Sequence, residues 1–130
     1  MQLSSEIKNI KTASATIIGY IKTMRANVHK DTLFDIKLCI EEAVRNAIVH
    51  GNKTKEDLMV DISYDINDNK IRIIVKDMGA GFKESNLPDP TEERNLYRES
   101  GRGVYLIHRL MKNVSYNKKG NVLTMEKKLK

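Results

Sequence analysis

Apolar residues recur every three or four positions in the first part of the chain, which is the spacing of one helix face. One stripe spans about residues 12–28 and a second spans residues 33–51. Asp31-Thr32 offers an N-cap for the second helix, and Gly51 suits its C-terminus because glycine enters the left-handed region at little cost. The stripes consist of Ala13, Ile17, Ile21, Met24 and Val28, and of Leu33, Ile36, Ile40, Ala43 and Ala47.

The period changes to two further along the chain, which predicts strands. Residues 59–66 and 70–77 alternate and are rich in β-branched side chains, and the turn-forming residues 67–69 join them into a hairpin. A second hairpin is predicted for residues 114–125 around Lys119-Gly120-Asn121.

Three segments complete the order of elements. Residues 2–9 are ambiguous and are compatible with a short edge strand, and a short helix is expected after Gly103. The polar stretch 83–101 has no clear period, and a loop of that length in a compact domain usually has a function. Helices grouped before and between hairpins predict an α+β fold, a two-layer sandwich with a mostly antiparallel sheet and helices on one face.

Size and composition fit a single globular domain over residues 1–130, with 40% hydrophobic and 31% charged residues. No apolar run is long enough to span a bilayer, so no membrane association is expected. The lone Cys39 cannot form an intramolecular disulfide, and with three scattered histidines it leaves no structural zinc site. A cytoplasmic, reducing location is therefore expected.

Positive charge is concentrated at the C-terminus. Residues 1–108 carry 16 basic and 16 acidic side chains, whereas residues 109–130 carry seven basic groups and one acidic group, which accounts for the net charge of +6. Such a cluster permits a nucleic-acid-binding module as an alternative function. The low aromatic content of 5% and the absence of a recognition-helix pattern argue against it, so no nucleic-acid partner is expected.

Glu42 and Asn46 are four residues apart on the second predicted helix, so both project from the same face. A carboxylate and an amide oxygen in this arrangement can hold a proton acceptor beside a hard cation, as phosphoryl transfer requires. A solvated polar helix face is the alternative explanation.

Two glycine-rich segments bracket the long polar loop. In Asp77-Met78-Gly79-Ala80-Gly81, a carboxylate at a strand end can accept a hydrogen bond from an exocyclic amine, and the glycines allow close approach of a flat ligand. In Gly101-Arg102-Gly103, glycines ahead of a helix would present free N–H groups to an anion. Each segment alone is also compatible with a plain turn.

Together the three segments resemble the ATP-binding domain of the GHKL superfamily, from about residue 10 to the end of the chain. Glu42-Ala43-Val44-Arg45-Asn46-Ala47 with His50-Gly51 resembles its N-box, and the two glycine-rich segments resemble its glycine boxes. The spacing is most similar to that of the anti-sigma factor serine/threonine kinases.

This resemblance implies ATP and Mg²⁺ as ligands and assigns a role to each matching residue. Asn46 would ligate the Mg²⁺ that bridges the phosphates, Glu42 would be the general base, and Asp77 would read the adenine amine. Glu41 is on a different helical face and is not assigned this role. The remaining implied contacts are Gly79 and Gly81 beneath the nucleotide, Gly101, Arg102 and Gly103 over the phosphates, and an ATP lid at about residues 83–102.

The resemblance also implies partners. The substrate would be an anti-anti-sigma STAS-domain protein phosphorylated on serine or threonine, a sigma factor would be the second partner, and a homodimer is expected. About 30 residues before the N-box helix leave no room for a helical phosphoacceptor hairpin, which favours a self-contained kinase. Two alternatives remain open: a switch-type kinase that binds no sigma factor, and an ATP-binding adaptor without catalysis.

Overall fold

The structure of the chain, a computed structural model, describes residues 1–79 and 99–129. Helices and strands alternate in groups along this part of the chain. The elements in order are β1 (Gln2–Ser4), α1 (Asn9–Met24), α2 (Lys30–Arg45), the π-helical segment η1 (Asn46–Gly51), β2 (Met59–Asn67), β3 (Lys70–Lys76), α3 (Glu99–Leu110), β4 (Lys112–Tyr116) and β5 (Val122–Lys128).

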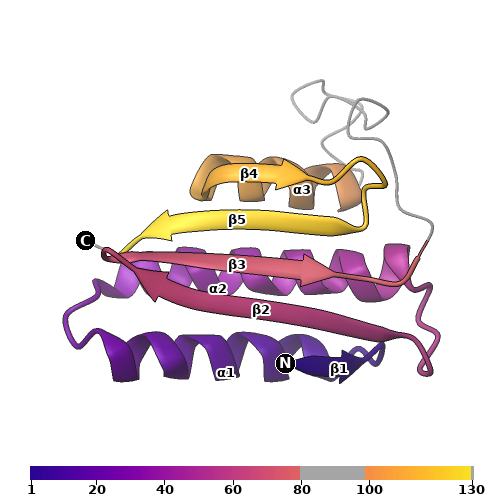
Figure 1. The fold of residues 1–130 in the computed structure, drawn as a ribbon, viewed down its shortest axis with the longest axis horizontal. Coiled ribbons are helices and arrows are strands. Elements are labelled where there is room, and N and C mark those ends of the chain that lie inside the picture. Colours follow the sequence, from indigo (N-terminus) through magenta and orange to yellow (C-terminus); the bar gives the residue numbers. More distant parts are fainter. Residues whose placement is uncertain (80–98, 130) are drawn as a thin grey trace.

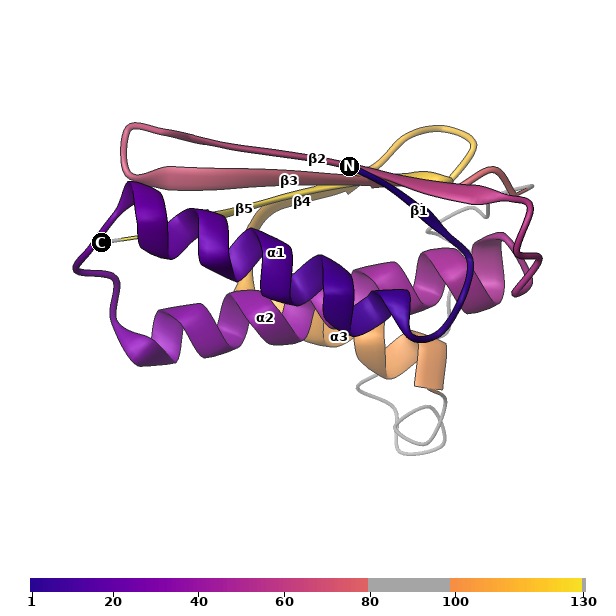
Figure 2. The same cartoon turned by 90° about the horizontal axis from the view of Figure 1, so that it is seen from below.

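The described elements form two layers. The five strands make one sheet in the order β1-β2-β3-β5-β4, and every neighbouring pair is antiparallel. The helices α1, α2 and α3 cover one face of this sheet, as the two orthogonal views show (Figures 1 and 2). The predicted α+β sandwich, its antiparallel sheet and the placement of helices on one face are confirmed.

The core lies between the layers because one side of each element is apolar. In β2 and β3, alternate residues such as Ile62, Ile71 and Ile73 are fully buried against the helices, as a period of two requires. The helices contribute residues of the two predicted stripes, including Ile17 and Ile40. Branched side chains therefore dominate the core, and they suit both the strands and the tightly packed interface with the helices.

The first helix is shifted from its predicted position. It ends at Met24, which is 48% exposed, and Val28 lies in the following loop. The N-cap of the second helix is His29 and not Asp31-Thr32, because Nδ1 of His29 accepts a hydrogen bond from the Asp31 N–H at 3.0 Å. Asp31 lies in the first turn, where its charge complements the helix dipole.

The end of the second helix differs in a second way. The prediction that Gly51 adopts a left-handed conformation is wrong. The chain continues helically through η1, and the left-handed residues are Lys53 and Thr54, with φ of 53° and 58°. Gly51 is needed for space instead, since an added Cβ would collide with the carboxylate of Asp77.

The third helix begins earlier than its glycines suggest. Because α3 starts at Glu99, Gly101, Arg102 and Gly103 lie inside its first turns and not ahead of it. No helix in the ranges 1–79 and 99–129 is both long and apolar enough to cross a bilayer.

Candidate functional site

The first part of the site lies where α2 meets α3. Glu42 and Asn46 lie one helical turn apart on the same face at the end of α2, as their spacing predicts. Gly103 of α3 lies against both side chains. A Cβ added to Gly103 would lie 2.7 Å from Oε2 of Glu42 and 3.4 Å from Nδ2 of Asn46. A side chain at position 103 would therefore overlap the carboxylate, so the glycine makes room for the Glu42 side chain where it lies.

Glu42 is held by a neighbour on its own helix. Nη1 of Arg45 donates to Oε1 of Glu42 at 3.1 Å, and the Glu42 side chain is only 17% exposed. One oxygen of the carboxylate is thereby anchored, while the other lies beside Gly103. A fixed, mostly buried carboxylate with one oxygen facing the neighbouring helix is a suitable proton acceptor.

The second part of the site lies at the end of β3. Asp77 is buried, its Oδ1 accepts the Gly79 N–H at 2.8 Å, and its carboxylate packs directly on Gly51. Burial raises the pKa of Asp77, and the hydrogen bond from Gly79 and the positive charge of Lys119 partly oppose that shift. The Cα of Gly79 in turn packs on the Gly51 carbonyl so closely that no Cβ would fit.

The short segment η1 joins these two parts, since Asn46 begins it and Gly51 ends it. Residues that are distant in sequence are thus gathered around the C-terminal end of α2. Of the other residues expected here, Gly81 and residues 83–98 of the predicted lid fall outside the described part of the chain. The roles of all the predicted site residues, and the lid itself, stay predictions.

Two nearby polar residues have structural roles. Oε2 of Glu41 accepts a hydrogen bond from the buried Ser14 at 2.6 Å, which ties α1 to α2 on a face away from Gly103. Cys39 is fully buried, and burial raises the pKa of its thiol to about 12, so it is an unreactive core residue.

Sequence reasoning missed two buried asparagines that contact the Asp77 segment. Asn52 is 1% exposed and accepts the Met78 N–H, while Asn121 is 9% exposed and donates to the Asp77 carbonyl. Asn121 was predicted only as part of the hairpin turn with Lys119 and Gly120, and Asn52 carried no prediction. Their burial is the signal, and it is not visible in the sequence.

Asn46 is the residue at this site best suited to a hard cation, because its amide oxygen lies on the same helix face as the Glu42 carboxylate. Among the residues that the structure describes, no three His, Cys, Asp or Glu side chains cluster as a metal site would require. A magnesium ion here would therefore depend on phosphate oxygens for most of its ligands.

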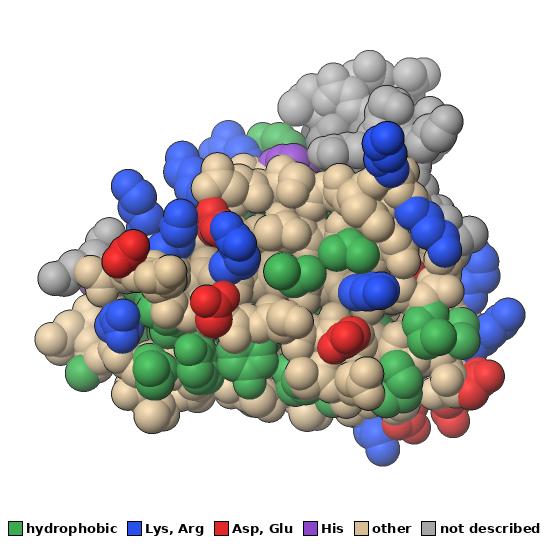
Figure 3. All heavy atoms as spheres, in the orientation of Figure 1, with side chains coloured by type: hydrophobic (Ala, Val, Ile, Leu, Met, Phe, Trp, Pro, Cys, Tyr) green, Lys and Arg blue, Asp and Glu red, His purple; other side chains and the backbone are tan. Residues whose placement is uncertain are grey.

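The basic residues of the C-terminal segment are divided between different surroundings. Nζ of Lys127 turns inward and donates to the Leu110 carbonyl at 2.6 Å, where it caps the end of α3. On the face of the sheet shown in Figure 3, Lys and Arg side chains are interspersed with Asp and Glu.

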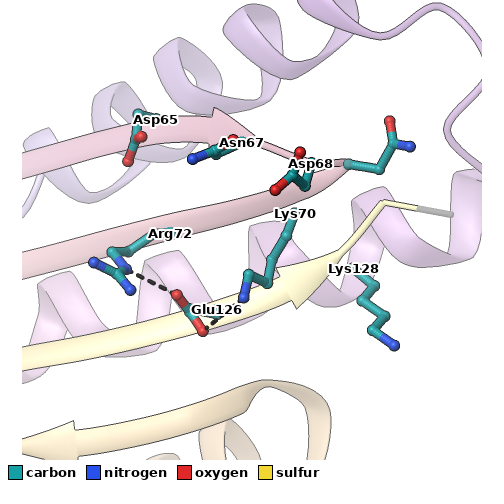
Figure 4. Close-up of a pocket in the computed structure, with 8 residues that line it drawn as sticks. Asp65, Asn67, Asp68, Lys70, Arg72, Glu126 and Lys128 are labelled. Carbon is teal, nitrogen blue, oxygen red and sulfur yellow. Dashed lines mark hydrogen bonds and ion pairs between the residues drawn. The ribbon is translucent and has the colours of Figure 1, made fainter.

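A cavity of about 340 Å³ lies elsewhere, at the other end of β3 from Asp77 (Figure 4). Its central feature is Glu126, 3% exposed, which pairs with Arg72 at 2.8 Å and with Lys70 at 3.4 Å. None of the predicted site residues lines it. The lining residues are Asp65, Asn67, Asp68, Asn69, Lys70, Arg72, Glu126 and Lys128.

The fold agrees with comparisons to known proteins. The family model described as the histidine kinase-like ATPase domain matches residues 4–127. The chain belongs to this family. The predicted relationship to the GHKL ATPases is thereby confirmed.

Similar proteins include the serine-protein kinase RsbW of Staphylococcus epidermidis, 30% identical over 138 aligned positions that cover all of this chain and 86% of RsbW. RsbW of Staphylococcus aureus strain MRSA252 is 29% identical with the same coverage. The histidine kinase domain of the Erythrobacter litoralis EL346 blue-light activated histidine kinase is 19% identical, with a TM-score of 0.57. This chain spans 61% of that solved chain, and the likeness supports the fold.

Proposed function

We propose that this protein is an ATP-dependent serine/threonine kinase that acts on a separate protein. The observation that carries the proposal is the packing of Gly103 against Glu42 and Asn46, because the missing side chain makes room for a held carboxylate beside an amide. Phosphoryl transfer needs such positioning and charge neutralisation more than it needs covalent chemistry.

In this proposal Glu42 is the general base. It accepts the proton of the attacking hydroxyl as that oxygen bonds to the γ-phosphorus and the bond to the ADP oxygen breaks. Arg45 anchors Oε1, so Oε2 is the oxygen that receives the proton. Asn46, one turn further on, would contribute its amide oxygen to the Mg²⁺ that arrives with ATP, and the metal would neutralise phosphate charge.

Asp77 reads the base. Its carboxylate accepts the adenine 6-amino group, and it would repel the 6-oxo group of guanine. Gly51 and Gly79 support this arrangement because their missing side chains let the Asp77 carboxylate lie against the backbone. Gly81, Gly101, Arg102 and Gly103 complete the nucleotide contacts, and residues 83–102 form the lid. Of the three residues in α3, Gly101 is the one in the first turn, where the helix does not use the backbone N–H, so its N–H is the one offered to a phosphate.

The protein substrate follows from the resemblance to anti-sigma factor kinases and from the similarity to RsbW, a serine-protein kinase. We infer an anti-anti-sigma STAS-domain protein as phosphoacceptor and a sigma factor as the second partner. The working unit is a homodimer in the cytoplasm. A partner-switching kinase without a sigma factor would share the same catalytic residues, so only binding experiments separate the two.

A transfer assay tests the catalytic assignment. Purified protein, Mg²⁺, γ-labelled ATP and a STAS-domain protein are mixed, and label on the STAS protein is followed for the wild type and Glu42→Gln. Loss of the base should lower the rate by about 10²–10⁴-fold and leave ATP affinity within a few fold. Glu41→Gln is the matched control, because Glu41 bonds to Ser14 away from the site.

Three outcomes are informative. Wild-type transfer by Glu42→Gln would refute the base assignment. ATP binding without transfer by the wild type, with several STAS proteins, would indicate the non-catalytic adaptor. Loss of transfer in both glutamate variants would mean that the end of α2 is sensitive to any change of charge.

A further inference from the structure

Two buried asparagines hold one peptide group from opposite sides. The peptide between Asp77 and Met78 presents its carbonyl to Nδ2 of Asn121 at 3.0 Å. The N–H of the same peptide donates to Oδ1 of Asn52 at 2.7 Å. Because the carbonyl and N–H of a trans peptide point in opposite directions, these two contacts fix the plane of the peptide.

Asn121 makes a second contact that fixes the other side of Asp77. Its backbone carbonyl accepts the Asp77 N–H at 3.0 Å, so the peptides before and after Asp77 are both held. The asparagine is itself held, since Nδ2 of Asn117 donates to its Oδ1 at 2.9 Å. The β4–β5 turn therefore provides a rigid support for the end of β3.

The side chain of Asn52 is also held by hydrogen bonds. Its Nδ2 donates to Oγ of Ser5 at 2.9 Å and to the carbonyl of Met59 at 3.1 Å. These partners come from the segment after β1 and from the first residue of β2, so the amide cannot rotate without losing buried hydrogen bonds. Leaving such groups unpaired costs about 1–3 kcal/mol each.

We propose that Asn52 and Asn121 are positioning residues that set the direction of the Asp77 carboxylate and thereby the preference for adenine over guanine. This inference rests on the function proposed above. With φ and ψ of Asp77 fixed and Oδ1 bonded to the Gly79 N–H, the carboxylate has one direction in which to meet a ligand. A carboxylate free to turn can instead accept the N1–H and 2-amino group of guanine.

The test compares affinities for Mg²⁺-ATP and Mg²⁺-GTP by calorimetry in the wild type, Asn121→Asp and Asn121→Ala. The aspartate keeps the size of the side chain but opposes an oxygen to the Asp77 carbonyl. The alanine removes only the side-chain contact and is the milder variant should the aspartate fail to fold. The dissociation constant for Mg²⁺-GTP divided by that for Mg²⁺-ATP measures the preference for adenine. This ratio should fall at least fivefold in both variants.

Ile73→Val is the control, because Ile73 is a fully buried core residue in β3 whose truncation destabilises the protein without touching either asparagine. A change that only unfolds part of the population weakens ATP and GTP binding equally and leaves their ratio unchanged. Retention of the wild-type ratio in both Asn121 variants would overturn the proposal.

Amide hydrogen exchange in the nucleotide-free protein distinguishes failure of this inference from failure of the proposed function. Exchange at Met78 and Gly79 should accelerate at least tenfold in Asn121→Ala relative to Ile73→Val. If the wild type binds no ATP, or binds both nucleotides equally, the proposed function fails. If the two amides exchange at control rates in Asn121→Ala, the asparagines do not hold the segment and the inference fails.

Discussion

Gly103 offers a substitution that separates catalysis from folding. A Cβ at this position lies 2.7 Å from Oε2 of Glu42, so in Gly103→Ala the carboxylate must retreat by roughly 0.7–1 Å to reach ordinary van der Waals contact. The obstacle is the end of a flexible side chain and not backbone, which makes the movement inexpensive. The expected consequence is a displaced base in an intact fold.

The stability effect of Gly103→Ala is small because two contributions oppose each other. Alanine in place of a helical glycine raises the free energy of unfolding by up to about 1 kcal/mol, and moving Glu42 from its contact with Arg45 lowers it by a similar amount. Transfer is far more sensitive, since a misplacement of about 1 Å in a catalytic group lowers the rate by about 10²-fold. We expect a 10–100-fold loss of phosphotransfer with a free energy of unfolding within about 1 kcal/mol of the wild type.

The assay measures transfer of the γ-phosphate to a STAS-domain protein together with urea unfolding of the same preparations. Gly19→Ala is the matched control, because Gly19 lies within α1 and an added Cβ meets nothing within 4 Å. It should gain stability and keep wild-type activity. Wild-type transfer by Gly103→Ala, at saturating ATP, would refute the idea that this glycine keeps space for the Glu42 carboxylate.

Two further outcomes are expected. Gly51→Ala should weaken ATP binding at least tenfold in calorimetry, because its Cβ would displace the Asp77 carboxylate, and unchanged affinity would contradict that contact. Hydrogen bonds from Asn113 and Arg72 lower the pKa of Glu126 to about 2, so its contribution to stability is present above about pH 4.5 and is lost as the pH falls towards 2. Because Arg72 is 57% exposed, solvent screening limits that contribution to about 1 kcal/mol. Urea unfolding of the wild type and Glu126→Gln should show this difference at pH 7 and not at pH 2, and an equal difference at both would be inconsistent with the shift.

The sequence predicts most of the fold because the sheet is built from strongly alternating strands. Residues such as Ile62 and Ile73 are buried in the register that their period predicts. The π-helical turn at the end of α2 was not predictable, since over a segment of six residues the four-residue spacing of the buried Val44 and Ile48 fits an α-helical and a π-helical turn alike. The start of α3 was placed too late because glycines have low helix propensity, and packing against α2 overrides it.

The candidate site was predictable where its members share one element and less so where they meet through space. Glu42 and Asn46 are linked by helix geometry, which the sequence displays directly. The importance of Asn52 and Asn121 depends on backbone groups 26 and 44 positions away. The sequence predicts a special role for Gly51 from its backbone freedom, whereas the structure shows that the role is to make room for Asp77. This close approach is visible only in three dimensions.

A calorimetric titration of Mg²⁺-ATP into the wild type and Asp77→Asn tests the central claim most directly. In the variant, the amide oxygen can still accept the Gly79 N–H, which leaves the amide NH₂ facing the adenine amine, so two donors oppose each other. We expect saturable binding by the wild type and a loss of about 10–100-fold in the variant, as for a hydrogen bond to a charged group. Absence of binding at millimolar ATP, or equal affinity of the two proteins, would contradict the account.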